Sequence, residues 1–83
     1  MEKSVTVGIR EGINADVVSI LVQAACKYES RLYLKEGDRR VNMKSIMGMM
    51  NMAVNCGEDV VVIAEGNDEE AAEEEIGRIL RGE

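Results

Sequence analysis

Val60-Val61-Val62-Ile63-Ala64 is an unbroken apolar run, and a well-marked helix start follows it within a few residues. Such a run is typical of a strand that is more heavily buried than its neighbours. The segment Asn67-Asp68-Glu69-Glu70 places acidic side chains where the positive end of a helix favours them. Arg78 and Arg81 lie near the other end, where cations are favoured. The sequence therefore predicts a central strand over 60–64 and a C-terminal helix.

Towards the N-terminus, alternating apolar and polar residues predict two more strands, over residues 4–9 and 31–35. Glu36-Gly37-Asp38 then predicts a turn into a short third strand over residues 39–42. Charged residues on the strands, such as Arg31, Lys35 and Arg39, are expected to discourage edge-to-edge pairing.

Two further helices lie between the strands. Apolar residues at helical spacing predict one over 16–28, which Asn14 is placed to cap. A second starts at Ser45 and runs to about Asn55, where Gly57 stops it. The order βαββαβα predicts a single α+β domain over residues 1–83, with a small antiparallel sheet and the helices on one face.

The helical patterns also predict which side chains are buried. In the first helix the predicted core stripe is Val17, Ile20, Leu21, Ala24, Ala25 and Tyr28, with Cys26 as a small buried hydrophobe. In the last helix the predicted dry face is Ala71, Ala72, Ile76, Ile79 and Leu80, and the solvated face is Glu69, Glu70, Glu73, Glu74 and Glu75.

Composition excludes several classes of function. The 83 residues include no His, so Ser-His catalysis, His acid–base chemistry and His metal sites are excluded, and no cofactor is expected. Cys26 and Cys56 are too few for a zinc site and are expected to be free thiols. The net charge of −6 argues against nucleic acid as the main partner. Without an apolar run of membrane-spanning length or a signal peptide, the chain is expected to be cytoplasmic.

The helix predicted from Ser45 has more apolar residues than a sheet can cover. Its core stripe is predicted to be Met49, Met52, Ala53 and Cys56. A neighbouring face then carries Ile46, Met47 and Met50. One hypothesis is that these three side chains bind a protein partner, because exposed Met clusters are adaptable docking surfaces. The alternative is a helix that is buried all round.

Ser45 also has two interpretations. Ser is a preferred N-cap residue, which gives it a purely structural role. A phosphate on Ser45 would instead meet the free N–H groups of the helix start and add about −1.5 to −2 charges beside the apolar face.

Three segments resemble the HPr family, the small phosphocarriers of the bacterial phosphoenolpyruvate:sugar phosphotransferase system. Residues 41–50, VNMKSIMGMM, look like its regulatory-serine motif, and residues 12–15 and 21–28 resemble its active-site loop and first helix. The resemblance covers residues 4–81. It implies that family's open-faced β-sandwich, a four-stranded antiparallel sheet with three helices on one face.

The chain departs from the family at the active site. The family motif is Gly-x-His-Ala-Arg-Pro-Ala, in which the His carries phosphate from enzyme I to the transporter component. Residues 12–18 read GINADVV, so Asn14 stands at the His position and Asp16 at the position of a phosphate-binding Arg. Before screening by solvent and salt, repulsion between Asp16 and an anion about 4–6 Å away would amount to about 3–4 kcal/mol at an effective dielectric near 20. The resemblance therefore implies a degenerate phosphocarrier site.

Two functional hypotheses follow. In the first, the chain resembles catabolite-repression HPr-like proteins, which lack the His. In those proteins HPr kinase/phosphorylase modifies the Ser, here Ser45, and the product binds a LacI-type transcriptional regulator. Those relatives usually keep the Arg that Asp16 replaces. In the second, the chain is an interaction module in which Ser45 is only a cap. The family's own label, a phosphocarrier, is contradicted by Asn14.

Overall fold

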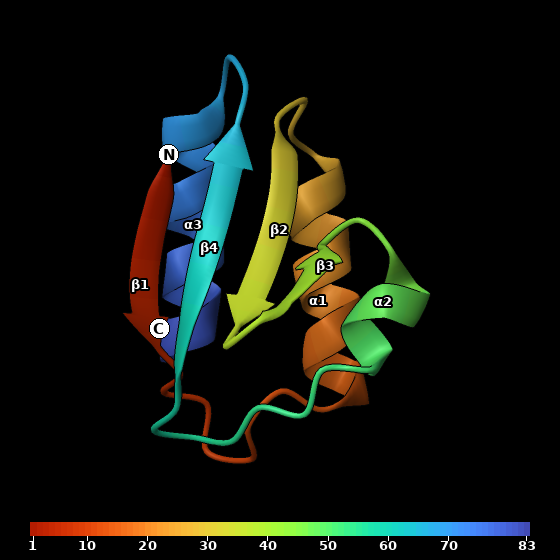
Figure 1. Ribbon diagram of the computed structural model, residues 1–83, viewed down its shortest axis with the longest axis vertical. Helices are drawn as coiled ribbons and strands as arrows, with labels where there is room; N and C mark the ends of the chain where they lie inside the picture. The colour runs from red at the N-terminus through yellow and green to blue at the C-terminus, as the bar shows by residue number, and fades with distance from the viewer.

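The computed structural model describes residues 1–83 and confirms the order βαββαβα (Figure 1). The strands are β1 (Glu2–Thr6), β2 (Arg31–Glu36), β3 (Arg39–Asn42) and β4 (Asp59–Glu65). The helices are α1 (Ala15–Cys26), α2 (Ile46–Met50) and α3 (Glu69–Arg81).

The four strands form one antiparallel sheet in the order β1-β4-β2-β3. The apolar run of β4 therefore lies between β1 and β2, as a central strand should. Val60, Val62 and Ala64 join the hydrophobic core. Because side chains alternate along a strand, Val61 and Ile63 point to the opposite face of the sheet.

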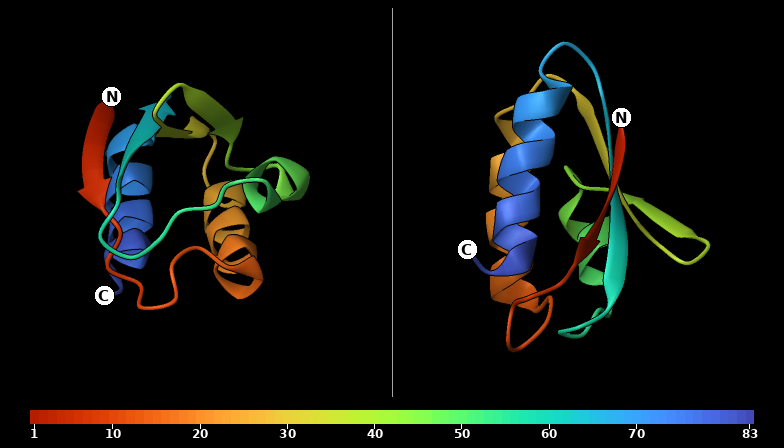
Figure 2. Two further views of the ribbon diagram at one scale, coloured as in Figure 1. Left: turned by 60° about the horizontal axis from the view of Figure 1, so that its bottom comes forward. Right: turned by 90° about the vertical axis from the view of Figure 1, so that its left-hand side faces the viewer.

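All three helices cover one face of the sheet, and the other face is open (Figure 2). This arrangement confirms the predicted open-faced α+β sandwich. On the open face the guanidinium of Arg40 lies 4.5 Å from the centre of the Tyr33 ring. None of the helices has the length and apolar character that a membrane span requires.

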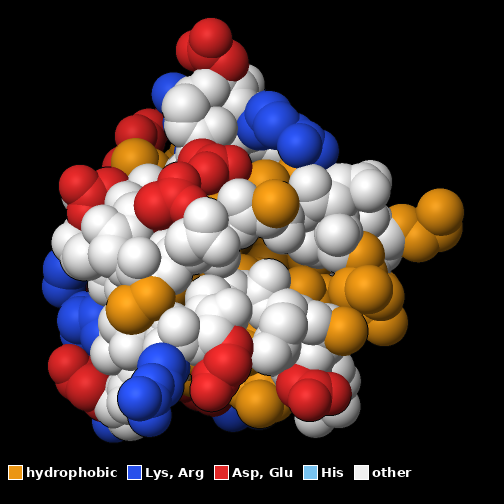
Figure 3. Space-filling view, turned by 90° about the horizontal axis from the view of Figure 1, so that it is seen from below, with side chains coloured by type: hydrophobic (Ala, Val, Ile, Leu, Met, Phe, Trp, Pro, Cys, Tyr) orange, Lys and Arg blue, Asp and Glu red, His pale blue; other side chains and the backbone are white.

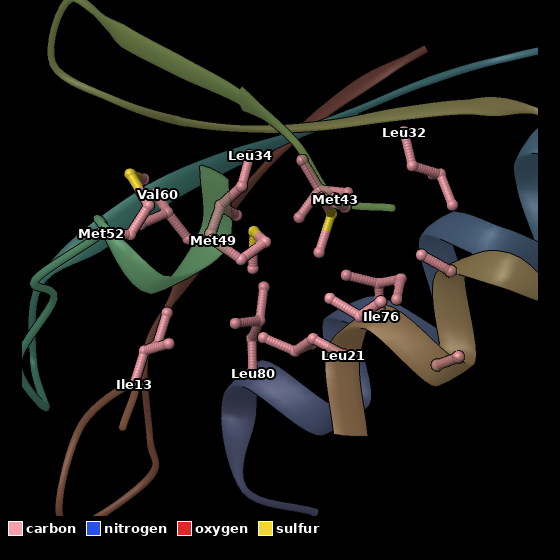
Figure 4. Close-up of a cluster of buried hydrophobic side chains, with 14 of the residues drawn as sticks. Ile13, Leu21, Leu32, Leu34, Met43, Met49, Met52, Val60, Ile76 and Leu80 are labelled. Atoms are coloured by element: carbon pink, nitrogen blue, oxygen red, sulfur yellow. The ribbon is translucent and has the colours of Figure 1, made fainter. Parts of the chain in front are cut away.

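Aliphatic and Met side chains fill the core between the helices and the sheet (Figure 4). The chain contains no Phe or Trp, so Met supplies much of the volume. The largest fully buried side chains include Leu21, Leu32, Leu34, Met43, Met49, Ile76 and Leu80.

The predicted bounds of the first strand, 4–9, are wrong. Strand β1 pairs with β4 only from Glu2 to Thr6. Beyond it the chain turns towards the end of α3, and the Gly8 N–H donates to the Leu80 carbonyl at 2.8 Å. A side chain at Gly8 would not fit, because a Cβ there would lie 2.2 Å from the Arg81 carbonyl oxygen.

The predicted core stripe of α1 is partly wrong. Ile20 is 53% exposed and Cys26 is exposed, whereas Val18 and Val22 are buried. Seven of the residues from 17 to 25 are apolar, which is more than one face of a helix can bury. Ile20 instead borders a shallow groove between α1 and α3.

The second helix is much shorter than predicted. It ends at Met50, with Asn51 as C-cap, and the chain then runs as an irregular segment to β4. In this segment burial alternates, so Met52 and Val54 are buried while Ala53 and Cys56 are exposed. Gly57 does not stop the helix. It has a positive φ of 94° in the turn before β4.

The predicted faces of α3 are also partly wrong. Its acidic face was expected to be solvated but is partly buried, and Ala71, which was placed on the dry face, is exposed. Glu75 is partly buried between α3 and α1, where Tyr28 Oη and Lys27 Nζ donate hydrogen bonds to it. These hydrogen bonds lower the pKa of the Glu75 carboxyl. Glu73 is only 4% exposed, and burial raises the pKa of its carboxyl to about 7.

Not all of the charged residues that were expected to discourage edge-to-edge pairing lie on an edge strand. The sheet edges are β1 and β3, so Arg39 lies on an edge strand, but Arg31 and Lys35 lie on the inner strand β2.

Asp68 joins the start of α3 to the turn between α1 and β2. Its carboxylate accepts hydrogen bonds from the Glu29 N–H at 2.9 Å, the Ser30 N–H at 3.0 Å and the Ser30 hydroxyl. Chiefly because of the bond from the Ser30 hydroxyl, the pKa of Asp68 lies below its ordinary value. Asp68 is the N-cap residue of α3, but its side chain makes no cap hydrogen bond there.

We expect Asp68→Ala to lower the thermal midpoint at pH 7, because the Ser30 and Glu29 donors lose their acceptor. A lowered pKa contributes stability above the unfolded-state value, about 3.9, that is lost as the pH falls through the folded-state value. The difference from wild type should therefore shrink in calorimetry as the pH is lowered below about 4. Asp38→Ala, in the exposed β2–β3 turn, is the control. Equal midpoints for wild type and Asp68→Ala at pH 7 would contradict this role.

Candidate functional site

Asn14 caps α1 as predicted. Its backbone is extended, and its side-chain oxygen accepts a hydrogen bond from the Val17 N–H at 3.0 Å. The loop before it rests on the segment that follows α2, because the Ile13 N–H donates to the Val54 carbonyl at 2.9 Å. Gly12 makes this approach possible, since it has a φ of 75° and a Cβ would lie 2.5 Å from the Val54 oxygen.

The chemistry at the start of α1 is that of a capped helix. Asn14 and Asp16 are both exposed, and Asp16 places a carboxylate in the first turn. The carboxylate favours the positive helix end and opposes a second anion there. The Asn14 side-chain oxygen is engaged as the cap.

Ser45 is held by a tight turn between β3 and α2. The Ser45 N–H donates to the Asn42 carbonyl at 3.1 Å, and the Lys44 N–H donates to Asn42 Oδ1 at 2.8 Å. Met43 anchors this turn in the core. The Ser45 side chain is exposed, and its Oγ accepts a hydrogen bond from the Gly48 N–H at 3.2 Å. The N-cap role of Ser45 is therefore confirmed, and its hydroxyl lies at the surface.

Lys44 contributes to this site in a way that sequence reasoning missed. Its Nζ donates to the Tyr28 carbonyl at 2.7 Å, just beyond the C-terminal end of α1. A cation is favourable at a helix C-terminus, so this bond fixes the turn before Ser45 to α1. Lys is a common residue at helix C-termini, but residues 28 and 44 are too far apart in sequence for any local pattern to pair them.

The three side chains predicted to be surplus to the core are exposed. Ile46 is 59% exposed, Met47 82% and Met50 53%. Met49, on the other side of α2, is fully buried. In Figure 3 a group of apolar side chains protrudes at the right-hand edge, the side on which α2 lies in Figure 1. We call Ile46, Met47 and Met50 the docking face.

The alternative of a helix buried all round is wrong for this chain. The helix packs on α1 and β3 through one side only. Exposed apolar side chains that gather on one short helix are unusual on a monomer surface and typically mark an interaction site.

Comparisons with known proteins agree with this architecture. Residues 1–81 match the family model described as PTS HPr component phosphorylation site. The chain is 42% identical over 79 residues to phosphocarrier protein HPr of Treponema pallidum, covering 95% of this chain and 90% of that protein. It is 38% identical over 74 residues to HPr-like protein Crh of Halalkalibacterium halodurans, covering 89% and 88%.

Among solved structures, a phosphocarrier protein HPr from Bacillus anthracis superposes with a TM-score of 0.92 at 30% identity, covering 96% of this chain and 95% of that chain. The class defined by the fold is therefore that of small open-faced α+β phosphocarriers and their HPr-like relatives. The chain belongs to the PTS HPr family.

We expect Asn14→Ala to lower the free energy of unfolding by about 0.5–2 kcal/mol, because the Val17 N–H loses its acceptor. Urea denaturation measures the change. Ser19→Ala, an exposed position within the same helix, is the control and should have little effect. A loss smaller than a few tenths of a kcal/mol at Asn14 would mean that its side chain does not cap α1.

A second comparison separates the docking face from the core. Met50→Ala should cost less than about 1 kcal/mol, because the Met50 side chain is largely in water, whereas Met52→Ala should cost about 2–5 kcal/mol. Met52 is 3% exposed. The two variants make the same chemical change two positions apart, so each is the control for the other. Equal losses in chemical denaturation would place Met50 in the core.

Proposed function

We propose that this HPr-family chain is a regulatory docking protein that carries no phosphoryl group at Asn14 and is switched by phosphorylation of Ser45. The observation that carries the proposal is the docking face directly after Ser45. Three exposed apolar side chains follow a surface hydroxyl within five residues.

Two positions, Asn14 and Asp16, support the loss of His phosphoryl transfer. The chain has no His at any position, so no other imidazole can replace the one that Asn14 lacks. Asp16 adds repulsion for an incoming phosphate at the same helix start. The two substitutions act independently, one on the acceptor atom and one on the electrostatics.

The Ser45 switch is supported by position and charge. A phosphate carries about −1.5 to −2 charges at pH 7 and would lie beside Ile46, the first residue of the docking face. A partner that uses the docking face would then meet both apolar side chains and a dianion. The proposed modifying enzyme is of the HPr kinase/phosphorylase type, and the proposed reader of the phosphorylated form is a LacI-type transcriptional regulator.

A second candidate function is an interaction module without a phosphate switch. It is favoured by the hydrogen bond from the Gly48 N–H, which already gives the Ser45 hydroxyl a structural role. In this case the docking face binds its partner in the unmodified protein, and Ser45 serves only to start α2.

Incubation with HPr kinase/phosphorylase and ATP distinguishes the two functions. We expect mass spectrometry to find one phosphate, located on Ser45, and none on a Ser45→Ala variant. The phosphorylated form should bind a LacI-type regulator more tightly than the unmodified form, and Met50→Ala should weaken that binding. An unmodified wild-type chain would support the simple interaction module.

A separate experiment tests the former His site. Wild type, incubated with enzyme I and phosphoenolpyruvate, should gain no acid-labile phosphate. Asn14→His alone should also transfer poorly, because Asp16 still repels the phosphate, whereas Asn14→His with Asp16→Arg should transfer measurably. An acid-labile phosphate on the wild-type chain would contradict the proposal, and full transfer by Asn14→His alone would remove the role of Asp16.

A further inference from the structure

Glu73 is a buried carboxylate that no other group satisfies. It lies on the side of α3 that packs on the sheet and is 4% exposed. Neither of its carboxylate oxygens has a hydrogen-bond partner. The same side chain borders a shallow pocket that is lined by Met1, Glu2, Lys3, Glu70 and Glu74, so Glu73 lies against the first residues of β1.

The charges around Glu73 do not neutralise it. The amine of Met1 donates to the Ala64 carbonyl at 2.9 Å and lies 3.7 Å from Glu69 Oε2, so it is engaged elsewhere. Lys3 forms no ion pair. Both cations favour the charged carboxylate from a distance, while Glu2 and Glu69 oppose it. Burial outweighs the attraction, which is why the pKa of Glu73 rises to about 7.

The other elements packed on α3 supply no partner. Strand β4 faces the helix with Val60, Val62 and Ala64, which carry no charge. The charged and titratable groups of α1 that reach α3 are Lys27 and Tyr28, and both bind Glu75. Glu75 is about 200° around the helix from Glu73. No group on these elements therefore compensates ionised Glu73, and movement of β1 away from α3 would bring its carboxylate into water.

Of the two elements that enclose Glu73, strand β1 is the shorter and lies at an edge of the sheet. It is a five-residue edge strand, paired on one side with β4 and free on the other. The stability of a fold is not uniform, and short edge elements open more readily than the centre of a sheet. We propose that Glu73 is a proton-dependent latch: the protonated carboxyl lets β1 stay docked on α3, and the ionised carboxylate favours local release of β1.

The direction of the pH dependence follows from the sign of the shift. A carboxyl with a raised folded-state pKa contributes stability that is present at low pH and is lost as the pH rises through the folded-state value. The pKa of Glu73 is raised from 4.5 to about 7 in the folded chain. Docking of β1 on α3 is therefore expected to loosen as the pH rises towards 7. Between pH 5.5 and 7.0 the equilibrium for opening of β1 should increase about tenfold.

Amide hydrogen exchange by NMR tests the latch. After division by the intrinsic exchange rate, protection of the β1 amides in wild type should fall about tenfold from pH 5.5 to 7.0. Amides of β2 serve as the internal reference for global unfolding. Glu73→Leu, which fills the same site without a proton, should keep β1 protected equally at both pH values, and so should Glu73→Gln where it folds.

Glu74→Gln is the matched control, because Glu74 is the exposed neighbour of Glu73 on the same helix. It should retain the wild-type loss of protection. Wild-type protection of β1 that is flat between the two pH values would overturn the latch. A loss of protection in Glu73→Leu as large as that in wild type would also overturn it, because the titrating group would then be another residue.

Discussion

Packing on a single face of the sheet is the constraint on which the rest of this structure depends. Strand β4 lies between β1 and β2, and its inward side chains meet the helices, whereas the opposite face of the sheet has no cover. The hydrophobic core is therefore a single layer, and of the β4 side chains on the open face only Ile63 is buried. Without Phe or Trp, that layer is filled by aliphatic residues and Met, and interiors of this kind are packed closely. Apolar residues beyond this layer must remain at the surface.

The docking face is a direct consequence of that limit. Met43 and Met49 are fully buried on either side of Ser45 and fix the orientation of the short helix α2. Ile46, Met47 and Met50 must then point outwards. The segment after α2 returns to the core through Met52 and Val54. The Val54 carbonyl accepts a hydrogen bond from the N–H of Ile13, the residue before Asn14. The serine turn and the loop before Asn14 are thus connected through one continuous piece of packed chain.

Much of the fold could be predicted from the sequence, because element order depends on local patterns. The run at 60–64, the acidic start of α3 and the caps Asn14 and Ser45 are each visible within a few residues. Helix α2 was predicted too long because the residues from 51 to 56 are compatible with a helix, and only tertiary contacts select an extended path for Met52 and Val54. Exposure of Ile20 and burial of Glu73 depend on how α1 and α3 rotate against the sheet, which no local pattern specifies. The candidate site was predicted more completely than the core, since caps and surplus apolar residues are local features, but the Lys44 bond to Tyr28 links distant residues.

The central claim is that the side chains excluded from the core by one-sided packing are the ones that bind a partner. Methyl NMR of the protein labelled at its six Met residues tests this claim most directly, with HPr kinase/phosphorylase added as the binding probe. The signals of Met47 and Met50 should shift or broaden as the kinase is added, while those of Met43, Met49 and Met52 keep their positions. Changes confined to the buried methionines, or complex formation that leaves Met47 and Met50 unchanged, would contradict the account.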